Sequence, residues 1–308
     1  MPGVQIPPRP FFPGNQSTST SRTETDFIVT IIGYWKIIRP VNSIVSGLAA
    51  ALAYLIATGT IIPQVILLIV IVTLITGAGN AINDYIDLPI DRVNRPGRPL
   101  PQGIVTLNGV LIFAGVLFTA GILLSLFTNP YCAFLAVFNS FLLIIYAKKL
   151  KTTPLLGNLS IAYLAGSIFL FGGAFAGLFG LINILVIALI TIFAMLAREL
   201  LKDAEDVPGD IEAGAKTFPV LFGVPRSIGI SIGITCIAII VSFVPFFRWG
   251  AWYLAAIIPV DVVILYSAWL AQGCSSPECI KKSRATSYLK YGMFASLVVF
   301  TLAALILQ

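Results

Sequence analysis

The sequence predicts an all-α, polytopic membrane protein with nine transmembrane helices, and three observations support this fold class. Of its 308 residues, 58% are hydrophobic and only 10% are charged, whereas soluble domains carry about 25% charged residues. Apolar runs long enough to cross a bilayer, which takes about 20 residues, occur nine times along the chain. None of these runs alternates polar with apolar residues, so the pattern excludes a β-barrel.

The nine apolar runs form one membrane domain, residues 28–308, which follows an N-terminal segment of different composition. Residues 1–27 are rich in Pro, Ser and Thr and lack the apolar core of a signal peptide, so we expect a disordered tail. The spans are expected, within a few residues, at 30–58, 61–82, 104–127, 130–147, 156–178, 181–200, 226–246, 251–271 and 287–307.

Lys and Arg residues predict which side of the membrane each loop faces, because cytoplasmic loops carry an excess of them. All but one of the 19 Lys and Arg residues lie before or at the start of the first span, or around the loops that follow even-numbered spans. The exception, Arg248, lies on the opposite side. We therefore expect a multi-pass protein of the cell membrane with a cytoplasmic N-terminus and an external C-terminus. The net charge of +6 follows from this rule and requires no nucleic-acid partner.

The cysteine and histidine content limits the possible chemistry. Cys274 and Cys279 are close enough in sequence to bracket a small loop. That loop is rich in Lys and is expected in the reducing cytosol, so we expect free thiols there. The chain has no histidine, which excludes imidazole acid–base chemistry, haem ligation by His and most zinc sites.

Nine of the 13 acidic residues lie in two segments, after spans two and six, on the expected cytoplasmic side. The two segments carry aspartates at the same intervals, three residues and then four. These are Asp84, Asp87 and Asp91 and, 119 residues later, Asp203, Asp206 and Asp210. Matching triplets at the ends of two even-numbered spans indicate a weak internal duplication of a four-helix unit.

The aspartate spacing predicts a magnesium site, because positions i, i+3 and i+7 share one face of a helix. Like charges at the end of a membrane helix repel each other, and the repulsion costs most where water is scarce. Oxygen ligands without His or Cys suit Mg²⁺, which joins one or two carboxylates to a substrate phosphate. The alternative is a solvated rim of charges, but two matching triplets on one side favour the metal. The expected ligands are Asn83, Asp84, Asp87, Asp91, Asp203, Asp206 and Asp210.

Basic residues interleaved with these acids are suited to bind the remaining charge of a phosphate group. Each of them also satisfies the positive-inside rule without any phosphate, so both explanations stay open. The residues are Arg95, Arg98, Lys202 and Lys216.

The two acidic segments resemble the paired signatures of the UbiA superfamily of intramembrane prenyltransferases. The first signature is matched by Asn83-Asp84-x-x-Asp87-x-x-x-Asp91, followed by Asn94, Pro96, Arg98-Pro99, Pro101 and Gly103. The second is matched by Asp203-x-x-Asp206-x-x-x-Asp210, followed by Gly214 and Lys216-Thr217. Arg39-Pro40-x-Asn42 and Tyr146-x-x-Lys149 also match the family. The resemblance covers nearly the whole chain beyond the tail. It implies nine helices around a central cavity, with a cytoplasmic cap formed by the loops after spans two and six.

Within the superfamily, these motifs are most similar to those of archaeal digeranylgeranylglyceryl phosphate synthases. The resemblance implies Mg²⁺-dependent transfer of a geranylgeranyl group from geranylgeranyl diphosphate to geranylgeranylglyceryl phosphate, an ether-lipid step that releases diphosphate. Members that act on chlorophyllide or on aromatic quinone precursors share much of the first signature, so these acceptors stay open. In this hypothesis the catalytic residues, which act through the metal, are Asp87, Asp91, Asp206 and Asp210. Substrate phosphate is bound by Arg39, Asn42, Tyr146 and Lys149 and by the interleaved basic residues.

A membrane transporter with a cytoplasmic cation site is the alternative from another class. Transport sites lie near the bilayer midplane, whereas these aspartates lie at span ends on one side, which favours the enzyme. Asp261 is predicted near the middle of span eight, but Pro259 favours a helix that starts late or breaks there, so we leave Asp261 outside the site. The expected partners are a prenyl diphosphate, a lipid or lipophilic acceptor and the bilayer, with no obligate protein partner.

Overall fold

The first apolar run forms two helices rather than one. The computed structural model describes residues 19–307, and in it α1 (Ser19–Ile37) and α2 (Pro40–Thr58) meet at Arg39, whose φ is 50°. Pro40 has no backbone N–H and disfavours the helical conformation in the residue before it, so α1 stops and α2 begins in a new direction. The expectation of a single span over 30–58 is therefore wrong, and the first span is α2.

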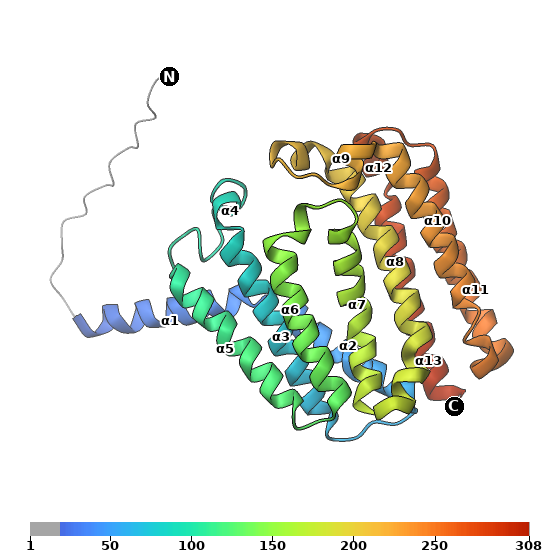
Figure 1. The fold of residues 1–308 in the computed structure, drawn as a ribbon, viewed down its shortest axis with the longest axis horizontal. Coiled ribbons are helices and arrows are strands. Elements are labelled where there is room, and N and C mark those ends of the chain that lie inside the picture. Colours follow the sequence, from blue (N-terminus) through green and yellow to red (C-terminus); the bar gives the residue numbers. More distant parts are fainter. Residues whose placement is uncertain (1–18, 308) are drawn as a thin grey trace.

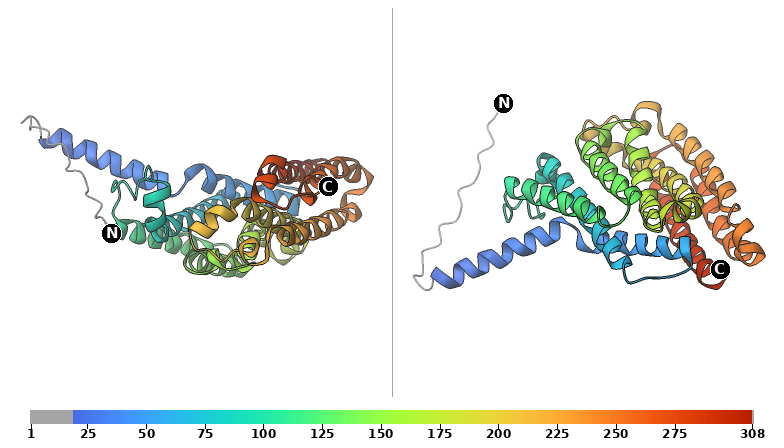
Figure 2. Two further views of the ribbon diagram at one scale, coloured as in Figure 1. Left: turned by 90° about the horizontal axis from the view of Figure 1, so that it is seen from above. Right: turned by 60° about the horizontal axis from the view of Figure 1, so that its bottom comes forward.

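Helix α1 leaves the bundle at an angle and extends away from it in every view (Figures 1 and 2). Its described side chains include exposed apolar ones such as Phe27, Ile31 and Trp35. Near its end, Tyr34 packs edge-on against Phe113 at 5.0 Å between ring centroids. Of the predicted tail, residues 1–18 lie outside the described residues, and the helix begins at Ser19.

Nine helices in the described part of the chain are long and apolar enough to cross a membrane, as the sequence predicts. Apart from the first and sixth spans, their ends agree with the predicted ones to within a few residues, and the all-α fold class is confirmed. The nine are α2, α3 (Val65–Ile86), α5 (Leu107–Ser125), α6 (Pro130–Lys148), α7 (Leu156–Phe175), α8 (Gly177–Glu212), α10 (Val224–Ser242), α11 (Phe246–Gln272) and α13 (Ala285–Ile306).

Helix α8 is much longer than predicted, with 36 residues. We expected the second acidic segment to follow the span as a loop, but the helix continues through all three aspartates to Glu212. The residues that follow the apolar part, Arg198 to Asp206, are mostly strong helix formers, and Pro208 does not end the helix. The end comes at Gly214, whose φ of 68° suits a glycine after a helix terminus.

Two hydrophobic clusters fill the bundle and share helices α2 and α7. One lies among α2, α3, α5, α6 and α7, and the other among α2, α7, α8, α10, α11 and α13. Helices α2, α3 and α5 pack in sequence, as do α7, α8 and α10. In both series the acidic segment lies at the end of the second helix, although the internal duplication itself remains a prediction.

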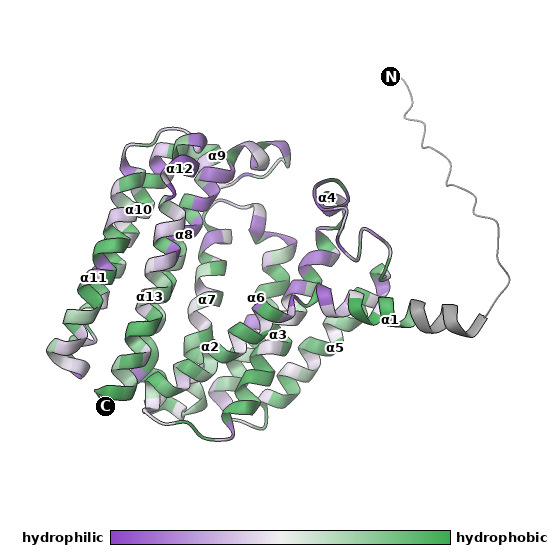
Figure 3. Cartoon of the chain, turned by 180° about the vertical axis from the view of Figure 1, so that it is seen from behind, coloured by the Kyte–Doolittle hydropathy of each residue, from purple (hydrophilic) through white to green (hydrophobic). Residues whose placement is uncertain are grey.

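Hydrophilic residues gather at one end of the bundle (Figure 3). Four short helices lie at this end: α4 (Leu88–Asn94), η1 (Leu150–Thr152), α9 (Phe218–Phe222) and α12 (Pro277–Ser283) (Figure 1). Both acidic segments reach this end, so residues 119 positions apart in the sequence share one face of the bundle.

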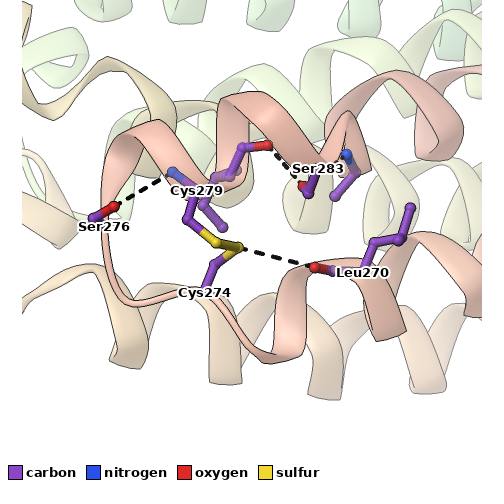
Figure 4. Close-up of a disulfide and its surroundings, with 7 residues drawn as sticks. Leu270, Cys274, Ser276, Cys279 and Ser283 are labelled. Atoms are coloured by element: carbon purple, nitrogen blue, oxygen red, sulfur yellow. Dashed lines mark hydrogen bonds between the residues drawn. A yellow bond between two sulfur atoms is a disulfide. The ribbon is translucent and has the colours of Figure 1, made fainter.

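Cys274 and Cys279 form a disulfide between α11 and α12, so the expectation of free thiols there is wrong (Figure 4). The chain turns back because Ser276 caps α12, its hydroxyl accepting a hydrogen bond from the backbone N–H of Cys279 at 3.3 Å. The turn brings the two Cα atoms to 5.4 Å, within the range that a disulfide spans. The expectation of free thiols was based on the Lys-rich composition of the loop, which indicates a side of the membrane. That composition carries no information about the backbone turn that brings the two cysteines together. Cys132 and Cys236 are free.

The close contact between α2 and α7 depends on Gly172. A substitution of this glycine is therefore expected to lower the stability of the protein. A Cβ atom at position 172 would lie 2.6 Å from Ala53 Cβ and even closer to the carbonyl oxygen of Ala50, so the helices would have to separate. We expect Gly172→Ala to lower the free energy of unfolding by about 1–3 kcal/mol, measured as a lower melting temperature in detergent. Gly115→Ala on α5 is the control, because nothing lies within 4 Å of that position. It should keep or raise the melting temperature, and equal losses in both variants would contradict the close-packing explanation.

Candidate active site

The first acidic segment folds into the end of α3, a tight turn and α4. The backbone N–H of Asp87 donates to the carbonyl oxygen of Asn83 at 2.8 Å, and that of Asp91 donates to the carbonyl oxygen of Asp87 at 2.8 Å. Pro89 then occupies the first turn of α4, where its missing N–H costs nothing. As a result Asp84 and Asp91 are buried, whereas the side chain of Asp87 is 17% exposed.

The two buried aspartates share one arginine. Arg98 Nη1 lies 2.5 Å from Asp91 Oδ2 and 3.1 Å from Asp84 Oδ1, and Arg39 Nη2 lies 2.8 Å from the same Asp84 oxygen. Buried carboxylates are tolerated only with such partners. This network joins the start of α2, the end of α3 and the segment after α4.

Asp87 and Asn83 complete the first cluster in different ways. Asp87 Oδ2 accepts a hydrogen bond from Lys151 Nζ at 2.5 Å, which brings η1 to the end of α3. Asn83 Oδ1 is buried and has no hydrogen-bond partner within the described chain. Buried acceptors are rarely left unpartnered, so this oxygen is available to a ligand.

The second acidic segment lies on the last turns of α8. Asp203 Oδ2 accepts a hydrogen bond from Asn158 Nδ2 of α7 at 2.7 Å, and Asp210 Oδ2 accepts one from the Thr217 hydroxyl at 2.8 Å. The side chain of Asp206 is 57% exposed, and Lys202 Nζ lies 4.0 Å away. The three aspartates lie on one helical face, as their spacing predicts.

The connection between α6 and α7 joins the two clusters. Its η1 turn reaches Asp87 of the first cluster through Lys151, while the carbonyl oxygen of Thr152 accepts a hydrogen bond from the Lys216 N–H at 3.2 Å. Tyr146, at the end of α6, lies close enough to Asp87, Glu199 and Asp203 to interact with all three charges. The η1 turn therefore connects the two acidic segments at one end of the bundle.

Some predicted binding residues do not contact the acids. The side chains of Asn42, Arg95, Lys149 and Lys216 are exposed and form no salt bridge with an aspartate in residues 27–307. Over the same residues, no three acidic or thiol side chains are arranged as a ready metal site. The proposed ligation of Mg²⁺ therefore remains a prediction.

Three contacting residues were missed by the sequence reasoning: Lys151, Asn158 and Thr217. Lys151 was counted only as one of the positive charges of its loop. Asn158 offers a signal in retrospect, because it is a buried amide near the start of an otherwise apolar span. Thr217 stands beside Lys216 in the second motif, but spacing alone does not indicate which of the two points to Asp210.

Asp261 lies in an unbroken stretch of helix, and not at a helix start as Pro259 suggested. Helix α11 continues through Pro259 and has its non-helical residue earlier, at Gly250. Asp261 is buried, and its Oδ2 accepts a hydrogen bond from the Ser242 hydroxyl at 2.7 Å. It lines a cavity between α2, α7, α8, α10, α11 and α13, apart from the aspartate triplets.

Comparison with known proteins assigns the family. The model of the UbiA prenyltransferase family matches residues 44–303, which is most of the chain and includes both acidic segments. The chain belongs to the UbiA prenyltransferase family. It is therefore a prenyltransferase, and the nine apolar helices in residues 19–307 make it a multi-pass membrane protein.

Curated UbiA relatives cover almost the whole chain. A digeranylgeranylglyceryl phosphate synthase of Methanoregula boonei is 52% identical over 275 residues, covering 89% of this chain and 99% of the relative. The enzyme of the same name from Methanoculleus marisnigri is 50% identical over 279 residues, covering 90% and 100%.

Solved UbiA structures share the fold. A structure described as digeranylgeranylglyceryl phosphate synthase superposes with a TM-score of 0.82 at 33% identity, covering 90% of this chain and 99% of that one. A UbiA homologue from Archaeoglobus fulgidus, solved with GPP and Mg²⁺ bound, has a TM-score of 0.61 at 17% identity, covering 85% and 99%. At that identity the second comparison supports the fold alone.

The ion pairs of Arg98 predict that a substitution at this position lowers the stability of the protein. Arg98→Gln removes the ion pairs of two buried carboxylates and leaves Asp91 without a charged partner, so we expect unfolding to become easier by about 3 kcal/mol. Melting in detergent, followed by tryptophan fluorescence, measures the change. Arg92→Gln is the matched control, because Arg92 lies in α4 and is exposed without a salt bridge among the described residues. Equal melting temperatures for the two variants would show that Arg98 does not hold the cluster.

Proposed function

We propose that this chain transfers a geranylgeranyl group from geranylgeranyl diphosphate to geranylgeranylglyceryl phosphate. One observation carries the proposal: two acidic segments that are far apart in the sequence are connected through η1 at one end of a membrane bundle that also contains apolar cavities. That arrangement suits a donor with a charged diphosphate and an apolar chain. The relatives of about half identity, named as synthases of this product, support the choice of acceptor.

The residues at the site fit a magnesium ion. The donor set consists of carboxylate and amide oxygens, which Mg²⁺ prefers, and Asn83 Oδ1 is a buried oxygen without a partner. We assign the ion to Asn83, Asp87 and Asp91 on one side and to Asp203, Asp206 and Asp210 on the other. When bound, Mg²⁺ would neutralise the diphosphate and so help it to leave.

The basic residues would hold the diphosphate as it departs. Arg39, Arg98 and Lys151 already lie among the first aspartates, and Lys202 lies beside Asp206. Their charges would stabilise the negative charge that develops on the leaving oxygen as its bond to the allylic C1 breaks. A hydroxyl oxygen of the acceptor then bonds to C1, and its proton is lost to water or to the diphosphate. We assign the exposed Asn42, Arg95, Lys149 and Lys216 to the approach of substrate phosphate.

An apolar cavity of about 240 Å³ is the proposed site of the donor chain. It lies between α2, α3, α6 and α7, and Val72, Leu143 and Phe171 are among the residues that line it. A chain that enters from the acidic end would leave its diphosphate beside Asn83 and Asp87.

We propose that the acidic end faces the cytoplasm and that the protein resides in the cell membrane. Lys and Arg residues at this end outnumber those at the other, where Arg248 stands alone among the described residues, and cytoplasmic loops carry this excess. A disulfide is rare on that side of a membrane, so the charge distribution and not the Cys274–Cys279 pair carries the assignment. The same orientation gives an external C-terminus.

Asp206 provides a direct test of the metal proposal. Its side chain is largely exposed and contributes little to packing, so Asp206→Ala should leave the fold intact. We expect the kcat/KM of prenyl transfer to fall by at least about 100-fold, because a metal ligand stabilises the departing charge by several kcal/mol. Glu278→Gln, at an exposed position of α12, is the control and should behave like the wild type. Near-normal transfer by Asp206→Ala at saturating Mg²⁺ would overturn the assignment.

Parallel reactions with different acceptors test which acceptor the protein uses. Purified protein is given radiolabelled geranylgeranyl diphosphate together with geranylgeranylglyceryl phosphate, an aromatic quinone precursor or chlorophyllide, in separate reactions. We expect label to appear in the glyceryl phosphate lipid alone. Label transferred to either of the other acceptors, but not to the glyceryl lipid, would assign the chain to another branch of the family.

A further inference from the structure

A second and larger cavity lies beside the proposed donor cavity. Its volume is about 400 Å³, and it lies between α2, α7, α8, α10, α11 and α13. Most of its wall is apolar, but Arg198, Lys290 and Asp261 also line it. Ser46, Ala165 and Ile168 line both cavities, so the two share a wall.

The guanidinium group of Arg198 lacks a partner for one of its hydrogen-bond donors. Its Nη1 pairs with Glu199 at 2.8 Å, but its Nε is buried and has no hydrogen-bond partner within the described chain. A buried donor without a partner is unfavourable, and an anionic oxygen is the acceptor that pairs best with a guanidinium group. Arg198 also stands five residues before Asp203 on α8, about 7.5 Å along the helix axis.

Lys290 supplies the second positive charge. It lies on α13, with its Nζ 5.9 Å from the ring of Phe294, and forms no salt bridge in the described part of the chain. Glu199 offsets one of the two positive charges at this part of the wall, which leaves a net positive charge there. The remaining charged group of the wall, Asp261, belongs to α11 and bonds to Ser242. An anionic head group is therefore attracted to Arg198 and Lys290 and repelled from Asp261.

We propose that this cavity binds the acceptor lipid, with its phosphate on Arg198 and Lys290 and its prenyl chain along Met195, Leu297 and Phe300. The proposal rests on the function proposed above and adds the residues that select the acceptor. Along α13, Lys290 and Phe300 are about 15 Å apart, so the cavity runs deep into the bundle. Two adjoining and largely apolar cavities, one of them lined by Arg198, match a reaction that joins two prenylated lipids.

Steady-state kinetics with both substrates varied tests this assignment. The variants are Arg198→Gln, Lys290→Gln and their combination, with Lys290→Arg as the conservative change. We expect the KM for geranylgeranylglyceryl phosphate to rise by about 10- to 100-fold in the Gln variants. The KM for geranylgeranyl diphosphate should stay near the wild-type value, and Lys290→Arg should restore most of the acceptor affinity. Lys282→Gln, an exposed lysine of α12 outside the cavity, is the matched control.

A phosphate-free acceptor separates a phosphate contact from a general structural effect. With geranylgeranylglycerol, the wild type and the Gln variants should react at similar low rates, because the phosphate that distinguishes them is gone. A loss that persists with this acceptor would show that the variants disturb the fold. An equal rise in KM for the prenyl diphosphate would show that Arg198 and Lys290 serve the donor. Either result overturns the proposal.

Direct binding distinguishes failure of this inference from failure of the proposed function. Geranylgeranylglyceryl phosphate is titrated into detergent-solubilised protein without any donor, and the tryptophan fluorescence is followed. We expect the wild type to bind it and the double variant to bind at least about 10-fold more weakly. Binding without turnover would refute the proposed function and leave the cavity assignment standing. Equal affinity of wild type and double variant would refute the cavity assignment.

Discussion

Buried carboxylates need counter-charges, and this requirement organises the polar end of the molecule. Asp84 and Asp91 are nearly inaccessible, and their charges are supported by Arg39 from the start of α2 and by Arg98 from the segment after α4. In a low-dielectric setting, loss of one partner costs far more than an exposed salt bridge contributes. The ion pairs therefore hold three separate segments in fixed positions. The second acidic segment is connected to them through η1, by the contacts of Lys151 and Thr152.

The division between a charged end and an apolar interior matches amphiphilic substrates. The aspartates and their basic partners lie at one end of the bundle, whereas the cavities between the helices are largely apolar. A soluble enzyme would have to shield such chains from water within its own core. In a membrane protein the surrounding lipid also shields such chains from water, which suits a family built from long apolar helices.

The sequence was informative where a simple period or charge count applies. Span number, fold class and the shared helical face of the second aspartate triplet all follow from length, hydropathy and helical spacing. It failed where local backbone geometry decides: the break at Arg39, the helical continuation through Pro208 and the turn that joins Cys274 to Cys279. It also failed for Lys151, Asn158 and Thr217, because which residue contacts an aspartate depends on how separate helices pack. Arg198 was counted only as a positive charge, since its unpartnered nitrogen is visible only in three dimensions.

Arg39 does two things at once. Its backbone makes the left-handed turn that sends α1 away from the bundle, and its guanidinium group holds Asp84. The direction of α1 and the ion pair of Asp84 therefore depend on the same residue. A substitution at position 39 acts on both: it removes a counter-charge from Asp84, and it changes the backbone preference at the bend. The helix that this bend sends outward carries Phe27, Ile31 and Trp35, exposed apolar side chains suited to the lipid interface.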